Sequence, residues 1–216
     1  MEHLADRGLL RTASEMVTDP GGVIRRYVDG QRRRYLAPHT YLFFGAALSL
    51  LSFQLYKDAI VQMARSEVVH AAMGERGLFS PEQASAYVEA LVFLTQQTAA
   101  TGLLMCIPFA LLLRLVFRGS GINLAEAVVF SFFTFGQAMV VQSVLTPLVV
   151  LATHDVIASV WTAQLPYVLV LSQSAAVLFG SPLRSILKVN LVLAASVALF
   201  SAGLAISIAA YVLLFR

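Results

Sequence analysis

Five long stretches without a charged residue restrict what this chain of 216 residues can fold into. No Asp, Glu, Lys or Arg occurs in residues 35–56, 90–113, 127–153, 156–183 or 189–215, and the shortest of these stretches has 22 residues. A helix of about 20 mostly apolar residues is long enough to cross a bilayer. Only 12% of the residues are charged, about half of the usual fraction in soluble domains. The sequence therefore predicts an all-α integral membrane bundle and excludes an ordinary soluble domain.

Helix signals beside these stretches set the bounds of the predicted spans. Ser80 and Pro81 have the residue types of a helix N-cap and first turn, so the second helix is expected to begin outside the bilayer. The last span is rich in small residues, mainly Ala, which permits close helix packing. We predict transmembrane helices at residues 38–56, 90–117, 124–152, 156–179 and 189–214, an external segment at 57–89 and a short basic linker, residues 180–188, before the last span.

The positive charges are unevenly distributed over the segments outside these spans. With the N-terminus in the cytoplasm, eleven Lys and Arg residues lie inside and four lie outside. The positive-inside rule favours this orientation. The chain stays charged for 34 residues before its first apolar stretch, an order unlike that of a cleavable signal peptide. We therefore expect the first span to act as the insertion signal, and the C-terminus to lie outside.

Residues 1–36, named here the basic arm, are predicted to precede a transmembrane domain of residues 37–216. A short amphipathic helix at 3–17 is followed by a second helix that Asp19 caps, Pro20 begins and Gly30 ends. This second helix has an apolar side formed by Val23, Ile24, Tyr27 and Val28. Such a helix suits the cytoplasmic headgroup layer, where it would contact anionic lipid through Arg25, Arg26, Arg32, Arg33 and Arg34. The alternative is a topology signal and a helix that packs over the inner end of the bundle.

Amide side chains are the main polar groups inside the predicted spans. They could face one another in a polar interior bent by Pro108, Pro147 and Pro166, or they could simply form hydrogen bonds between helices. The residues concerned are Gln96, Gln97, Gln137, Gln142, Gln164 and Gln173.

No pattern typical of an enzyme occurs in the sequence. The four histidines are scattered without ligand spacing, and the single cysteine, Cys106, allows neither an internal disulfide nor a thiolate zinc site. We expect no metal, no cofactor, no nucleic-acid partner and no catalytic residue. Glu126 lies near a helix start, where the helix dipole favours it, and we expect it to form an ion pair with Arg114 and Arg118.

Residues 19–38 resemble the signature of the DUF3667 family of bacterial membrane proteins, which runs from D-P-G through an amphipathic helix to G-x-R-x-x-Y-x-x-P. Residues 123–130, which include Glu126, are similar to the family's opening of the third span, although Ala127 replaces the usual histidine. The paired-cysteine zinc ribbon that often precedes the signature is absent from this sequence. The resemblance implies a multi-pass protein of the bacterial inner membrane, with a layout loosely similar to that of Yip1-type proteins. The matching signature residues are Asp19, Pro20, Gly30, Arg32, Tyr35 and Pro38.

Two hypotheses about function follow from the sequence. The first is a non-enzymatic membrane scaffold or interaction protein, which contacts anionic lipid and a protein partner, or a second copy of itself, through the basic arm. The second is a carrier or channel for a small neutral or amphipathic molecule, which would pass through the interior lined by the glutamines.

Overall fold

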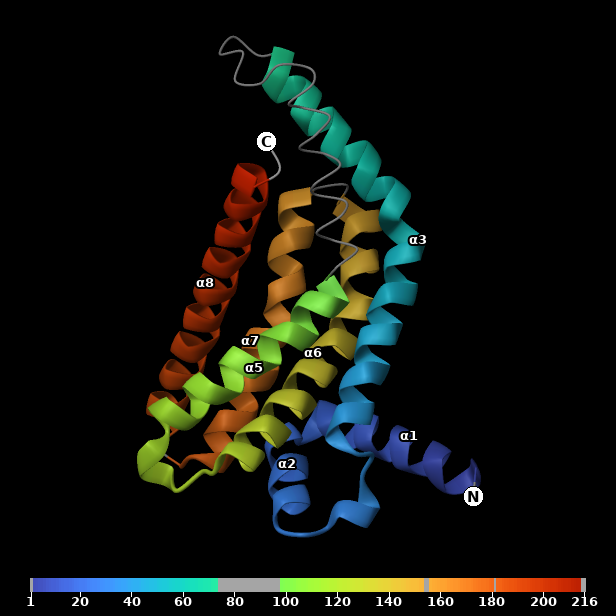
Figure 1. Cartoon of the computed structure of the whole chain (residues 1–216). Helices are drawn as coiled ribbons and strands as arrows, with labels where there is room; N and C mark the ends of the chain where they lie inside the picture. Colours follow the sequence, from blue (N-terminus) through green and yellow to red (C-terminus); the bar gives the residue numbers. More distant parts are fainter. Residues whose placement is uncertain (1, 74–97, 154–155, 181, 215–216) are drawn as a thin grey trace.

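The computed structural model describes residues 2–73, 98–153, 156–180 and 182–214 of the chain (Figure 1). These residues form helices joined by short connections, and no strand occurs among them, which confirms the predicted all-α class. The helices are α1 (Glu2–Thr18), α2 (Pro20–Val28), α3 (Pro38–Met73), α5 (Thr98–Val116), α6 (Leu124–Thr153), α7 (Val156–Leu178) and α8 (Pro182–Leu214), with 3-10 turns η1 (Arg32–Arg34) and η2 (Arg118–Ser120).

Three helical segments in the described residues are long and apolar enough to cross a membrane. They are Arg32–Ala59, which includes the whole first predicted span, Leu124–Thr153 in α6 and Pro182–Gly203 in α8. Two shorter apolar segments, Gly102–Val116 in α5 and Thr162–Leu178 in α7, correspond to the second and fourth predicted spans. The described part of the chain is therefore all-α, with helices long and apolar enough for a membrane protein.

Two helices extend beyond their predicted bounds. α3 continues past Tyr56 to Met73 without a break, because no Gly or Pro interrupts residues 46–73 and a charged residue such as Lys57 does not end a helix. α8 begins at Pro182, so the prediction that residues 180–188 form a separate linker is wrong for residues 182–188. Pro182 fits the first helical turn, after the positive φ of 75° at Gly180. The predicted helix start at Ser80 and Pro81 lies outside the described residues.

α6 lies at the centre of the bundle and packs against α3, α5 and α7, while α8 packs against α5 and α7 (Figure 1). α3 and α6 approach each other most closely at two glycines. A Cβ atom added to Gly45 would lie 2.5 Å from the carbonyl oxygen of Gly136, and one added to Gly136 would lie 3.1 Å from Cα of Leu42. Backbone therefore meets backbone here, a contact that small residues permit between membrane helices.

α1 and α2 close the end of the bundle at which α3, α6 and α8 begin (Figure 1). α2 packs against α7 and α6, and Val23 and Ile24 belong to the main hydrophobic core with exposed fractions of 0% and 1%. Protein covers these two side chains, so the interpretation of α2 as a helix whose apolar side faces lipid does not hold. The structure favours the alternative, in which the second helix of the basic arm packs over the end of the bundle.

Candidate functional site at the basic end

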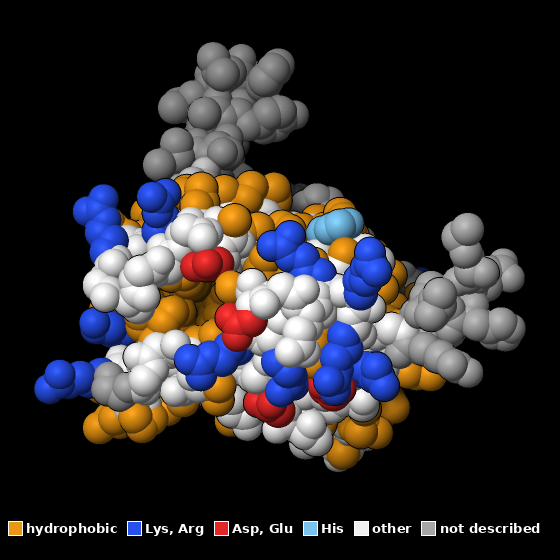
Figure 2. Space-filling view, turned by 90° about the horizontal axis from the view of Figure 1, so that it is seen from below, with side chains coloured by type: hydrophobic (Ala, Val, Ile, Leu, Met, Phe, Trp, Pro, Cys, Tyr) orange, Lys and Arg blue, Asp and Glu red, His pale blue; other side chains and the backbone are white. Residues whose placement is uncertain are grey.

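The end of the bundle closed by α1 and α2, named here the basic end, is rich in positive charge. Figure 2 shows this end face-on, with Lys and Arg side chains spread over it and fewer acidic ones between them. The face is hollowed, and apolar side chains line the hollow (Figure 2). The exposed arginines come from α1, α2, η1, the last turn of α5, η2 and the first turn of α8 and are Arg11, Arg25, Arg32, Arg33, Arg34, Arg114, Arg118 and Arg184.

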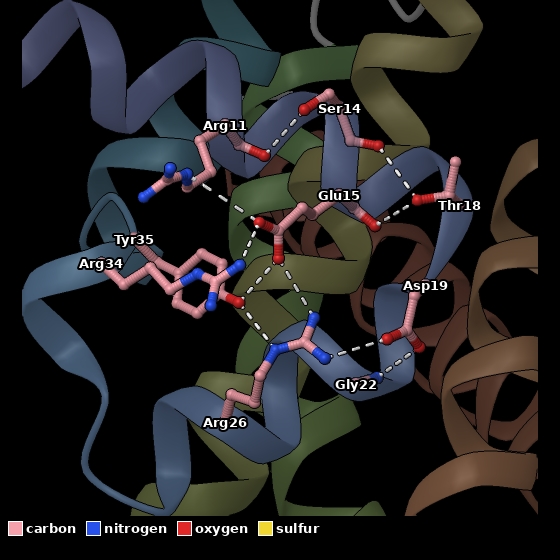
Figure 3. A network of polar contacts seen from close by, with 9 residues as sticks. All are labelled: Arg11, Ser14, Glu15, Thr18, Asp19, Gly22, Arg26, Arg34 and Tyr35. Atoms are coloured by element: carbon pink, nitrogen blue, oxygen red, sulfur yellow. Dashed lines mark hydrogen bonds and ion pairs between the residues drawn. The ribbon is translucent and has the colours of Figure 1, made fainter.

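A polar network centred on Glu15 joins α1, α2 and η1 (Figure 3). Arg34 donates to Glu15 Oε1 at 2.7 Å, and Arg26 donates to Glu15 Oε2 at 3.1 Å. The hydroxyl of Tyr35 donates to the same Oε2 at 2.7 Å and accepts from Nε of Arg26 at 2.7 Å. Arg11 lies further from Glu15, at 3.9 Å. One carboxylate in α1 therefore holds residues from the two following elements.

The network keeps Glu15 ionised. Burial raises the pKa of the Glu15 carboxyl, but the hydrogen bonds from Arg34 and Tyr35 and the charges of Arg34 and Arg26 outweigh burial, so that its pKa is lowered. The hydrogen bond with Tyr35 raises the pKa of Arg26, and the hydrogen bond to Glu15 raises the pKa of Arg34. The charged forms of these groups therefore stabilise one another.

Two residues of the basic arm fix the backbone around the network. Asp19 caps α2, because its Oδ1 accepts from the amide of Gly22 at 2.9 Å, while its Oδ2 accepts from Arg26 at 3.1 Å. Thr12 is buried, and its hydroxyl accepts from the amide of Leu36 at 2.9 Å. The predicted N-cap at Asp19 and first helical position at Pro20 are confirmed. Gly30, just after α2, has a positive φ of 105° that favours glycine.

The five arginines predicted to contact lipid have different surroundings. Arg26 and Arg34 form ion pairs within the network. Arg25, Arg32 and Arg33 are exposed, and they form no ion pair within the described part of the chain. These three guanidiniums are therefore available to groups outside the protein.

Sequence reasoning missed Glu15 and Thr12, which the fold brings against residues about 20 positions later. A usable signal was present, because Glu15 and Asp19 are the two carboxylates that most closely precede the arginine-rich segment 25–34. Glu15 lies in the last turn of α1 and Asp19 is the N-cap of α2, and both accept from Arg26.

Two cavities open between the elements of the basic end. The larger has a volume of about 770 Å³ and lies between the start of α3, the start of α6 and the segment from α2 to η1; its polar lining residues are Arg32, His39, Asn123 and Glu126. The smaller, of about 310 Å³, lies between α2, the turn before α6 and the end of α7. Glu126 and Val28 line both cavities, so the two are neighbours.

Glu126 forms a capping box rather than the predicted ion pair. Its Oε2 accepts from the amide of Asn123 at 3.0 Å, and Asn123 Oδ1 accepts from the amide of Glu126 at 2.9 Å. Within the described residues neither Arg114 nor Arg118 forms an ion pair with it. The expected pair is therefore wrong, because the carboxylate already has a backbone donor three residues away.

The glutamines do not gather into one polar interior in the described structure. Gln137 is buried and accepts a hydrogen bond from the hydroxyl of Tyr41, and Gln142 is also buried. Gln164 and Gln173 lie on the exposed side of α7, so of the two alternatives the shared polar interior does not hold for these two residues. Gln96 and Gln97 lie outside the described residues. Gln137 Nε2 and Gln142 Oε1 have no hydrogen-bond partner among the described residues.

The geometry defines a class: a helical protein with membrane-length apolar helices, whose N-terminal helices close a basic end. Residues 6–50 match the family model described as a protein of unknown function (DUF3667), which confirms the resemblance of the signature to this family. The match spans most of α1, all of α2 and η1 and the first part of α3, so the whole Glu15 network lies within it. No curated protein and no solved structure matches the chain.

Proposed function

We propose that this protein is a non-enzymatic scaffold or interaction protein of the bacterial inner membrane, and that its basic end contacts anionic lipid and a protein partner at the cytoplasmic surface. The observation that supports this proposal is the set of exposed guanidiniums of Arg25, Arg32 and Arg33, which form no ion pair with any described residue, at one end of an apolar helical bundle. An arginine near an anionic leaflet contributes about 1 kcal/mol to the attraction.

The arrangement of helices supports five spans. α3, α6 and α8 run away from the basic end, and α5 and α7 run back toward it (Figure 1). The 19 described residues of α5 span about 28 Å at 1.5 Å per residue, close to the hydrocarbon thickness of about 30 Å. Five crossings would place the two ends of the chain on opposite sides of the membrane, and the positive-inside rule would then place the basic end in the cytoplasm and the C-terminus outside.

Orientation is tested by thiol labelling of the full chain in intact cells. Arg25→Cys lies at the basic end and Ser66→Cys lies in the part of α3 furthest from it along the helix. An impermeant thiol reagent should label Ser66→Cys and leave Arg25→Cys unlabelled until the cells are broken. The opposite result would place the basic end outside and remove the basis for its contact with the cytoplasmic leaflet.

Lipid preference is tested on the full chain purified in mild detergent. Phosphatidylglycerol should copurify in excess over phosphatidylcholine from a defined mixture, and the double variant Arg25→Gln, Arg33→Gln should lower this excess. The matched control is Lys57→Gln, which removes one positive charge from α3 far from the basic end. An excess that the double variant leaves unchanged, or that Lys57→Gln lowers equally, would contradict the proposal.

A carrier for a small neutral or amphipathic molecule is the second candidate. It is supported by buried polar atoms of α6 that have no hydrogen-bond partner in the described part of the chain, Gln142 Oε1 and Thr146 Oγ1. A carrier needs water to reach these positions in at least one of its states. Labelling of Gln142→Cys by a small water-soluble thiol reagent would favour the carrier, and full protection would favour the scaffold.

A further inference from the structure

We propose that the larger cavity of the basic end binds a phospholipid headgroup that contains both a phosphate and an amine, of the phosphoethanolamine type. The inference rests on the proposed function in one respect, namely that this end lies at the membrane surface. The cavity volume of about 770 Å³ is within the range of about 300–1,000 Å³ that is usual for ligand sites.

Unlike charges line this cavity without forming an ion pair. Arg32 and His39 come from η1 and the first turn of α3, and Glu126 comes from the first turn of α6. Arg32 makes no ion pair with any residue in the described ranges, Glu126 included. Cationic and anionic groups that share one cavity and do not contact each other leave space for a ligand with the complementary pair of charges.

Each end of a phosphoethanolamine headgroup has a matching group in this arrangement. The planar guanidinium of Arg32 can donate two parallel hydrogen bonds to a phosphate. Glu126 uses Oε2 to accept from the Asn123 amide, which leaves Oε1 for an ammonium group. A headgroup with a phosphate but no amine would leave this carboxylate unpaired beside a second anion, so the cavity should favour the zwitterion.

The remaining lining residues suit the apolar part of a lipid. Tyr27, Val28, Val128, Val129 and Phe132 form much of the wall, and α6 continues from this wall as a helix long and apolar enough to cross a membrane. A lipid whose headgroup lies between Arg32 and Glu126 would therefore have its acyl chains beside apolar helix surface. A free phosphoethanolamine ion would gain nothing from this wall.

The test is native mass spectrometry of the full chain in detergent, with phosphatidylethanolamine, phosphatidylglycerol or soluble phosphoethanolamine added. The wild-type protein should bind phosphatidylethanolamine about tenfold more tightly than phosphatidylglycerol, the size expected for one charge-assisted hydrogen bond. Glu126→Gln should remove this preference while keeping the capping box, which Gln also forms. Arg32→Gln should weaken both lipids, because each has a phosphate.

Two matched controls separate these effects from general charge. Asp29→Asn removes an exposed carboxylate of the same end that does not line the cavity, and Arg184→Gln removes an exposed guanidinium that does not line it either. Both should leave the affinity for phosphatidylethanolamine unchanged.

Three results would overturn the inference: equal binding of the two lipids by the wild type, a preference that survives Glu126→Gln, or soluble phosphoethanolamine that binds as tightly as the lipid. The proposed function is tested separately, through Arg25, Arg33 and the orientation of the chain. A failure there, with the effect of Glu126→Gln intact, would leave the headgroup site standing.

Discussion

Replacing Glu15 by Gln should loosen the attachment of α2 to the bundle. The carboxylate accepts from Arg26, Arg34 and Tyr35, at distances of 3.1, 2.7 and 2.7 Å. The substitution removes the negative charge and replaces one acceptor oxygen by an NH2 group, which faces guanidinium donors that it cannot satisfy. Gln has nearly the shape of Glu and a similar helix propensity, so α1 itself should persist.

The size of the effect follows from how exposed the network is. The side chain of Glu15 is 23% exposed, and that of Arg26 is 32% exposed. An exposed ion pair contributes about 0.2–1 kcal/mol, whereas breaking a buried pair costs about 3–5 kcal/mol. For this half-buried network we expect a loss of about 1–2 kcal/mol in the free energy that holds α2 in place, which corresponds to a change of about 5- to 30-fold in the opening equilibrium.

Thiol labelling at position 24 measures this opening. Ile24 is 1% exposed, so Ile24→Cys should react only when α2 leaves the bundle. Cys106 is the single native cysteine, and replacing it by Ala leaves the introduced thiol as the only one. In this background Glu15→Gln should raise the labelling rate about 5- to 30-fold. Arg11→Gln is the control, because this exposed partner at 3.9 Å should change the rate by only about twofold.

The reasoning would be refuted if Glu15→Gln changed the labelling rate no more than Arg11→Gln does. In that case the apolar contacts of α2 would hold it without help from the network. Labelling that is already fast in the parent protein would refute the packing of α2 itself.

The remaining predictions concern two glycines and pH. Gly45→Ala should lower the free energy of unfolding of the detergent-solubilised protein by about 1–3 kcal/mol, because its methyl group would lie 2.5 Å from the Gly136 carbonyl oxygen. Gly119→Ala is the control and should change this free energy little, because no atom lies within 4 Å of its new methyl group. Equal effects of the two substitutions would contradict the close approach of α3 and α6. The methyl group of Gly30→Ala would also contact no other atom, but residue 30 has a φ of 105°. The resulting backbone strain of about 1–2 kcal/mol should accelerate labelling at position 24, and an unchanged labelling rate would contradict the strain. Because the pKa of Glu15 is lowered from its ordinary 4.5, the stabilisation by its carboxylate is fully present above pH 4.5 and is lost as the pH falls through the folded-state pKa. Cleavage of the basic arm by pepsin should therefore accelerate below pH 4.5 more in the wild type than in Glu15→Gln. Parallel pH profiles of the two proteins would argue against ionised Glu15 as the stabilising group.

Local signals in the sequence account for the parts of the fold that could be predicted. Asp19 followed by Pro20 places the start of α2, and the turn before Leu124 places the start of α6, because capping depends on residues three or four positions apart. The predicted span ends at residue 56 while α3 continues to Met73, because hydropathy marks where a span ends and does not mark where a helix of good helix formers ends.

The candidate site was harder to predict because its contacts join distant segments. Tyr35 donates a hydrogen bond to Glu15, which lies 20 positions earlier in the chain, and the periodicity of either segment alone does not predict this contact. The exposed positions of Gln164 and Gln173 depend on the rotation of α7 about its axis, which depth along a span does not define. Glu126 lies at a helix start, as predicted, but its partner is different. Its carboxylate accepts a hydrogen bond from the Asn123 amide and forms no ion pair with the expected arginines among the described residues.

The packing of α2 on α7 has a consequence for the order of assembly. A Cβ atom added to Gly21 would lie 2.5 Å from Cβ of Val177, so the surface that covers α2 is synthesised more than a hundred residues after α2 itself. Domains form as the chain emerges from the ribosome, N-terminal parts first, but α2 has to wait for α7 to be inserted. Its buried apolar side, with Val23 and Ile24, is not fully covered until then, which makes docking of the basic arm a late step that can report insertion of the helices up to α7.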